Sequence, residues 1–270
     1  MGKIIAFANQ KGGVGKTTSC VNTSASLASL GKKVLLIDID PQGNASSGVG
    51  VRKNSDMMSV YDLIVGDATI EEVIQHSPIE GFDILPANNE LAGAEVELVY
   101  MESREKIIKR LLDKVRDSYD FITIDCPPSL GLLTINALTS ADSVLIPIQC
   151  EFFALEGLSQ LMNTIRLIKK KLNPNIQIEG VLLTMKDSRS SLGQQVAAEI
   201  KKYFNESVYE TTIPRNIRLA EAPSHGLPIC MYDKSCVGAR AYMSLAEEIL
   251  TKNGISYKKP NIDDKRRPRK

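Results

Sequence analysis

Apolar segments of strand length recur along the chain. They lie at 3–8, 33–38, 82–86, 120–125, 143–148 and 177–184, and the stretches between them are long enough to form helices. An alternation of buried strands with helices is typical of a mostly parallel sheet. We therefore predict one α/β domain in which a twisted sheet is flanked by helices on both faces.

Two of the remaining segments are predicted helices. In the first, apolar side chains return every three or four residues. They are Leu155, Leu158, Leu161, Met162, Ile165, Ile168 and Leu172. Three lysines at 169–171 place positive charge at the carbonyl end of this helix, and Pro174 follows as a breaker. We expect the apolar stripe to face the core, and we predict a second helix over 238–251.

The composition is that of a globular protein without a membrane span. Apolar residues make up 43% of the 270 and charged residues 24%. The longest apolar runs, such as 34–37 and 144–148, are strand-sized, whereas a spanning helix needs roughly 20 residues. The first residues lack the features of a secretory signal. Five cysteines without a C-x-x-C pair fit a reducing compartment, so we expect a cytoplasmic protein.

A basic segment closes the chain. Residues 258–270 hold seven Lys or Arg and two Asp, a local charge of +5, although the whole chain carries only +1. Two interpretations stay open, an arm for nucleic acid or membrane and a solvated, disordered end. Because the segment is rich in Pro and charge, we expect a folded domain over 1–252 and a basic, disordered tail over 253–270.

The most specific signal is a glycine-rich loop near the N-terminus. It follows an apolar strand and leads into a helix-like segment, and its residues are Lys11, Gly12, Gly13, Val14, Gly15, Lys16, Thr17 and Thr18. Glycines let backbone N–H groups converge, and a helix N-terminus adds donors and a positive dipole end, so the loop is predicted to bind an oligophosphate. Lys16 would contact the β- and γ-phosphates, and the Thr17 hydroxyl would bind Mg²⁺.

The loop departs from the common phosphate-binding pattern. G-x-x-x-x-G-K-[ST] requires glycine where the chain has Gln10, and Lys11 instead completes the rarer box K-G-G-x-G-K-[ST]-[ST]. This deviant Walker A box resembles the P-loop family that includes ParA/Soj partition ATPases, the division-site protein MinD and the nitrogenase iron protein. In that family the early lysine reaches the nucleotide of a dimer partner. The resemblance implies that Lys11 reaches the nucleotide of the partner. Lys11 and Lys16 would then both be catalytic residues.

Carboxylates follow two of the predicted strands. Asp38 and Asp40 come after the run at 34–37, and Asp125 ends the run at 121–124. Ligands of parallel sheets bind beyond the carboxyl ends of the strands. Hydrolysis of a phosphate bond needs a group that orients water, for which Asp40 is the candidate. Asp125 would hold Mg²⁺ through a bound water. For Asp38 two roles stay open, support of the Mg²⁺ shell and capping of a turn.

Further segments match the same family. D-x-D-P-Q at 38–42 resembles its switch I segment, whose second aspartate positions or activates the water, and Asp125 stands at its Walker B position. The segment at 213–216 resembles the family segment that packs on adenine, which implies Pro214 and Asn216 as contacts. The resemblance therefore implies a P-loop fold with ATP and Mg²⁺ as cofactors.

Within this family the chain resembles the ParA/Soj branch across residues 1–252. The most discriminating run is I-P-R-N-x-x-L-A-E-A-P-S-x-G from 213 to 226. The nitrogenase iron protein has a cluster cysteine in a glycine-rich turn beyond the Walker B aspartate. In this chain Cys126 adjoins Asp125 and is followed by prolines, which argues against the nitrogenase branch. The MinD branch ends in an amphipathic membrane helix, whereas the basic tail has only Ile262 as an aliphatic residue.

The resemblance implies chromosome or plasmid partition. In that family an ATP-bound dimer binds DNA non-specifically, a ParB/Spo0J-type centromere-binding protein stimulates slow hydrolysis, and release follows. The protein would be cytoplasmic and nucleoid-associated, without membrane contact. Alternatives are a MinD-like membrane-associated division-site ATPase, a nucleotide-gated scaffold and a metabolic ligase that uses the same loop.

Non-specific DNA binding requires several cations that face phosphates. Arg189 and Arg218 match basic DNA-contact positions of Soj-like proteins. Lys201, Lys202 and the basic tail are weaker candidates for the same surface.

Overall fold

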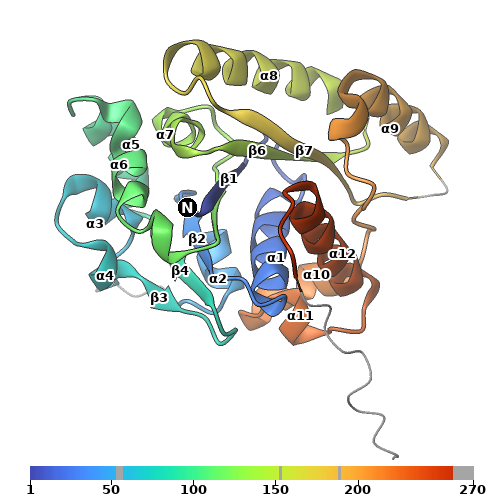
Figure 1. Cartoon of the computed structure of the whole chain (residues 1–270), viewed down its shortest axis with the longest axis horizontal. Helices are drawn as coiled ribbons and strands as arrows, with labels where there is room; N and C mark the ends of the chain where they lie inside the picture. Colours follow the sequence, from blue (N-terminus) through green and yellow to red (C-terminus); the bar gives the residue numbers. More distant parts are fainter. Residues whose placement is uncertain (53–56, 152–153, 188–189, 258–270) are drawn as a thin grey trace, which may run out of the picture.

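A seven-stranded sheet forms the centre of the protein (Figure 1). The structure, a computed structural model, describes residues 1–52, 57–151, 154–187 and 190–257. In sheet order the strands are β3 Gln75–His76, β4 Phe82–Leu85, β2 Val34–Asp38, β5 Phe121–Asp125, β1 Lys3–Phe7, β6 Ser143–Gln149 and β7 Gln177–Thr184. Every neighbouring pair is parallel except β3 and β4, which are antiparallel.

The six predicted strands are confirmed, with end points that differ by at most two residues. All five residues of β2 and of β5 are buried, which explains why these strands have continuous apolar sequences instead of an alternating pattern. The two-residue β3 was not predicted, because two residues are too few to show a period.

Helices cover both faces of the sheet, as predicted. On one face α1 Lys16–Ser29 and α12 Val237–Lys252 pack against alternate strand residues such as Ile5 and Leu36. On the other face the intervening residues, such as Ile4 and Leu35, meet the second set of helices. The helices of this second set are α3 Val60–Val65, α4 Ile70–Val73, α5 Leu91–Leu98, α6 Ile107–Asp113, α7 Leu132–Ser140, α8 Ala154–Lys171 and α9 Ser191–Phe204.

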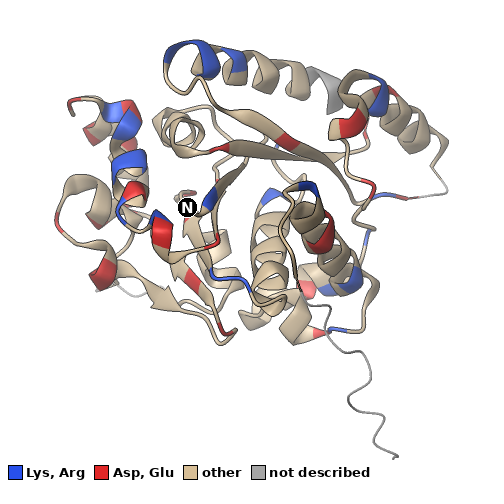
Figure 2. Cartoon of the chain, in the orientation of Figure 1, with Lys and Arg blue, Asp and Glu red and all other residues tan. Residues whose placement is uncertain are grey.

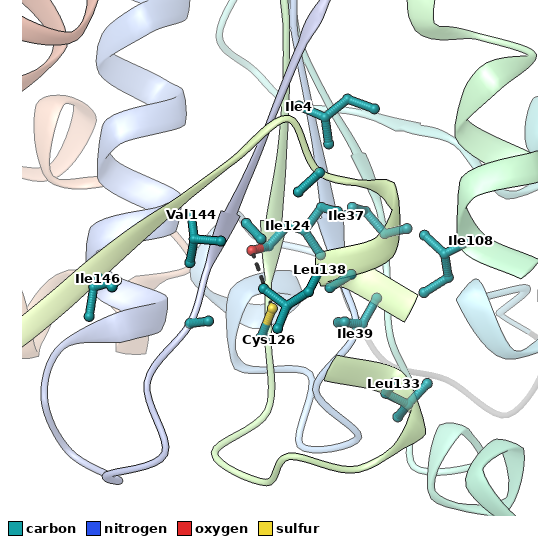
Figure 3. Close-up of a cluster of buried hydrophobic side chains, with 14 of the residues drawn as sticks. Ile4, Ile37, Ile39, Ile108, Ile124, Cys126, Leu133, Leu138, Val144 and Ile146 are labelled. Atoms are coloured by element: carbon teal, nitrogen blue, oxygen red, sulfur yellow. Dashed lines mark hydrogen bonds between the residues drawn. The ribbon is translucent and has the colours of Figure 1, made fainter. Parts of the chain in front are cut away.

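Figure 3 shows part of this second core. Ile4, Ile37, Ile124 and Val144 come from four neighbouring strands and lie in one cluster with Leu138 of α7. Cys126 lies in the same cluster, and burial is the main cause that raises the pKa of its thiol. Cys126 is therefore packed as part of the core.

Both predicted helices are present. α8 buries Leu158, Leu161, Ile165 and Ile168 in the core, and the side chain of Leu155 lies outside the described residues. α12 exceeds the predicted range by one residue at each end. Among the described residues, none of the helices combines the length and the apolar character that a membrane crossing requires.

Short elements complete the fold. They are α2 Asn44–Gly48, α10 Ile217–Glu221, α11 Ile229–Tyr232 and the 3-10 turns η1 Arg104–Lys106, η2 Arg116–Ser118, η3 Asn205–Ser207 and η4 Ala222–His225. Beyond α12, Ile255 and Tyr257 are partly buried against the α1 side of the core. The packed part of the chain therefore reaches residue 257, and the basic segment from 258 lies outside the described residues.

Candidate nucleotide-binding site

The glycine-rich loop connects β1 to α1. Gly13 and Gly15 have φ of 75° and 78°, in the left-handed region that favours glycine, and Gly15 is the N-cap of α1. Gly12 differs, because its φ is not positive and a Cβ built on it meets nothing within 4 Å. Within one copy neither conformation nor crowding requires glycine at position 12, so its exposed backbone is available to an approaching molecule.

The loop and the start of α1 form one wall of a cavity. The cavity has a volume of about 380 Å³ and is lined by Gly12, Gly13, Gly15, Lys16, Thr17, Thr18, Asp40, Gln42, Asn44, Pro128 and Met185. Lys16 is only 7% exposed. The first turn of α1 has neither an acidic residue nor a side-chain cap among the described residues, so its N–H groups are open to an anion.

Asp125 ends β5 at the base of this region. It is fully buried, and neither of its carboxylate oxygens has a hydrogen-bond partner among the described residues. Burial, together with the negative charge of Asp38, raises the pKa of Asp125, and the Thr17 hydroxyl and the Lys16 charge act in the opposite direction. An unpartnered buried carboxylate close to a threonine hydroxyl fits a hard cation such as Mg²⁺.

Asp38 pairs with Asp125 in the register of β2 and β5. Its Oδ2 accepts hydrogen bonds from the amide and the hydroxyl of Ser46, at 2.8 and 2.7 Å, and its Oδ1 accepts one from the Asp40 amide at 3.2 Å. Burial raises the pKa of Asp38 to about 6 against these hydrogen bonds, which lower it. Because both oxygens already have partners, the geometry favours the turn-capping alternative over a role in the Mg²⁺ shell.

Asp40 lies at the cavity wall and is 6% exposed. Its Oδ1 accepts a hydrogen bond from the Gln42 amide at 3.0 Å, which fixes the turn that leads into α2. Asp40 and Lys16, which the sequence placed 24 positions apart, thus line the same cavity.

Lys11, at the start of the loop, is not among the residues that line the cavity, and its side chain contacts Glu151. Its Nζ forms an ion pair with Glu151 at 2.7 Å, and both side chains are substantially exposed. The backbone amide of Lys11 donates to Asn9, whose own amide donates to the Pro147 carbonyl. Glu151 was not predicted, because it meets Lys11 across 140 positions of the sequence.

A second cavity adjoins the first and contains the predicted adenine contacts. It has a volume of about 390 Å³. Its mainly apolar walls include Pro214, Asn216 and Tyr242. Gly15, Thr18 and Met185 line both cavities. Met185 was missed, because the sequence does not reveal its φ of 48°, a left-handed conformation that is uncommon outside glycine and that often marks functional sites.

The candidate DNA contacts are not all brought together. Arg218 lies on α10, where it forms ion pairs with Glu221 at 2.9 Å and Asp233 at 3.7 Å. Lys201 and Lys202 are exposed on α9, which lies apart from α10 in Figure 1. Arg189 lies outside the described residues. Figure 2 shows Lys and Arg concentrated on outer helices such as α8, whereas the sheet is nearly free of them.

A glycine loop between β1 and α1, with acids at the ends of β2 and β5, defines a P-loop ATPase. A family model described as an AAA domain matches residues 2–178. The chain is 60% identical to the sporulation initiation inhibitor protein Soj of Bacillus subtilis over 92% of this chain and 98% of that protein. It is 51% identical to the chromosome-partitioning ATPase Soj of Treponema pallidum over 94% and 99%. The chain therefore belongs to the Soj/ParA family of chromosome-partitioning ATPases, which confirms the resemblance.

A solved structure agrees with the fold. Cobyrinic acid a,c-diamide synthase from Mycobacterium smegmatis, crystallised with an ATP analogue and magnesium, is 35% identical and has a TM-score of 0.82. The similarity covers 95% of this chain and 98% of that chain.

Proposed function

We propose that this protein is an ATP-dependent DNA-partitioning ATPase whose MgATP-bound dimer binds DNA non-specifically. Slow hydrolysis, stimulated by a ParB/Spo0J-type partner, releases the DNA and so drives chromosome or plasmid segregation. The observation that carries the proposal is the phosphate cavity that joins Lys16, Asp40 and the open backbone of Gly12. This cavity can sense the terminal phosphate of ATP and also face a second copy of the chain.

Different residues would bind the different parts of MgATP. Lys16, Thr17 and the first-turn amides of α1 would hold the phosphates, and Pro214 and Asn216 would contact adenine. Mg²⁺ would supply charge neutralisation on the transferring phosphoryl group, with Thr17 and Asp125 as the protein groups that hold it. Asp40 would orient water toward the phosphate.

Dimerisation would bring Lys11 to the nucleotide of the other copy. In one copy alone, Lys11 is paired with Glu151 near the surface. Exposed ion pairs contribute only about 0–1 kcal/mol, so this pair can be exchanged for a phosphate contact at small cost. Dimerisation would also double the number of candidate DNA contacts, which are Arg218, Arg189 and the α9 lysines, and two linked sites bind far more tightly than one.

The central experiment measures binding of arbitrary duplex DNA to the full chain. We expect tight binding with ATP, weak binding with ADP, and persistent ATP-dependent binding for Asp40→Ala, because that variant would keep the triphosphate. Affinity should fall steeply with added salt. Equal affinity in all three states would remove the mechanism. Lys16→Ala is the control, because it should lose nucleotide binding and hence the ATP effect.

A metabolic ligase remains the second candidate, and the likeness to the diamide synthase structure favours it. Phosphate release distinguishes the two functions. Stimulation by DNA together with a basic N-terminal peptide of a ParB-type partner would support partition. Stimulation by a small carboxylate or amine would support the ligase instead.

A further inference from the structure

Glu95 of α5 directs its carboxylate at the segment that follows Asp125. Its Oε1 is buried and has no hydrogen-bond partner among the described residues. A Cβ built on Gly131 would overlap this oxygen and lie 2.9 Å from the Glu95 Cδ. A buried carboxylate oxygen without a donor is costly. Its position is therefore better explained by a donor that approaches in another state of the protein.

The Glu95 carboxylate occupies the space that a side chain at position 131 would take. The Gly131 φ of −74° and ψ of −172° are open to any residue, so the backbone conformation does not require glycine. Gly131 is also the N-cap of α7, and α7 has no side-chain cap hydrogen bond. The first-turn N–H groups of a helix lack partners within the helix, and a negative charge beside them is favourable. The first-turn amides of α7, which begin directly after Gly131, are therefore suitable donors for the Glu95 carboxylate.

The segment between Asp125 and α7 reaches the phosphate cavity. Pro128 lines that cavity together with Lys16 and Asp40. The Thr134 hydroxyl of α7 donates to the Ser129 carbonyl at 2.6 Å, so the segment is tied to the first turn of α7. A small movement of that turn is therefore coupled to the wall of the phosphate cavity.

α5 is also connected to the other acidic site. The Ala87 amide, four positions before α5 begins, donates to the Ser46 hydroxyl at 2.9 Å. The same hydroxyl donates to Asp38 at 2.7 Å. The approach to α5 thus contacts the segment of Asp38 and Asp40, while Glu95 contacts the segment of Pro128.

We propose that Glu95 is a positioning residue for ATP hydrolysis. Its carboxylate accepts hydrogen bonds from first-turn amides of α7 when the terminal phosphate is bound, and it thereby holds residues 126–131 in the arrangement that hydrolysis requires. Glu95 acts through this segment and does not touch the nucleotide. The inference depends on the nucleotide placement of the proposed function, and it is independent of DNA binding.

The test compares Glu95→Ala, Gly131→Ala and the double variant in the full chain. Alanine at 131 should displace the flexible carboxylate without straining the backbone, so both single variants remove the same contact. We expect kcat for ATP to fall by about 10- to 100-fold in each, because small misplacements remote from the reacting atoms have effects of this size. KM and the Kd for ADP should stay within about two-fold of wild type. The double variant should lose no more than either single variant.

Two further variants complete the design. Glu95→Gln keeps an acceptor oxygen and nearly the same shape, so it should recover most of the lost kcat. Glu97→Gln is the matched control on the same helix, since its carboxylate accepts from the Tyr61 hydroxyl and does not face the segment. Unchanged kcat in both single alanine variants would overturn the proposal. So would losses that multiply in the double variant, or a parallel loss of ADP affinity.

Discussion

At the scale of single residues, Asp125 and Asp38 form a pair of buried acids. For Asp38 the pKa rises from 3.8 to about 6, and burial is the main cause. The pKa of Asp125 is raised as well, by burial and by the charge of Asp38. Because the folded pKa exceeds the unfolded one, the stability that Asp38 contributes is fully present below about pH 4 and is lost as the pH rises through about 6. The contribution of Asp125 falls with rising pH in the same direction.

Asp125→Asn should therefore stabilise the nucleotide-free protein at neutral pH. Removing an unsatisfied buried charge recovers about 1–3 kcal/mol. Each kcal/mol raises Tm by about 2–4 °C in a chain of this size. Thermal unfolding at several pH values checks this, and the decline in Tm between pH 4 and 7 should be shallower in the variant.

The same variant should lose the part of ADP stabilisation that depends on Mg²⁺, because a ligand stabilises only the state to which it binds. Asp113→Asn, at an exposed position on α6, is the control. Wild-type dependence on Mg²⁺ in Asp125→Asn would contradict the placement of the cation.

Site residues that belong to a local motif were predictable from the sequence. Lys16 and Asp40 were placed by the strand, glycine and acid pattern around them, and they line one cavity. Glu151, Met185 and Glu95 were missed for a common reason. Each acquires its position through a contact with a distant segment or through a backbone conformation, and neither leaves a local pattern in the sequence.

At the scale of elements, a hydroxyl connects α2 to its surroundings. Ser46 donates to Asp38 at the end of β2 and accepts from the Ala87 amide before α5. The fully buried Ser46 side chain therefore joins α2, β2 and the segment before α5. The longer strands were predicted from their apolar runs and α8 from its helical spacing, but α2 and β3 are too short to show either signal.

Ser46→Ala should destabilise the fold by about 1–3 kcal/mol, because it leaves the Ala87 amide without its acceptor and takes a donor from Asp38. Urea unfolding measures this change. Ser47→Ala on the same helix is the control, since the Ser47 hydroxyl is half-buried and bonds only the Gly43 carbonyl among its described contacts. Equal stability of the two variants would rule out the proposed connection.

At the scale of the whole molecule, the proposed dimer requires two copies to close over the glycine loop. A side chain at Gly12 would project into open space within one copy, so Gly12→Val should fold and bind ADP normally. In the dimer the added methyl groups would crowd the interface, at a cost of about 1–3 kcal/mol, which weakens dimerisation about 10- to 100-fold.

Sedimentation with ATP measures the monomer–dimer equilibrium. Asp40→Ala is the positive control, because it should retain ATP and stay dimeric. A Gly12→Val protein that dimerises as tightly as Asp40→Ala would show that the loop does not face the partner.

The second cavity, which contains the predicted adenine contacts, is lined by residues that lie far apart in the sequence. Gly15 and Thr18 come from near the N-terminus, and they line this cavity together with Pro214, Asn216 and Tyr242 of α12. The Tyr242 hydroxyl also lies 3.1 Å from that of Ser19 on α1. During synthesis on the ribosome the glycine loop therefore emerges about 200 residues before the cavity wall that is predicted to contact adenine. With adenine in that cavity, firm capture of ATP would await nearly the last helix, and an unfinished chain would not enter the nucleotide cycle.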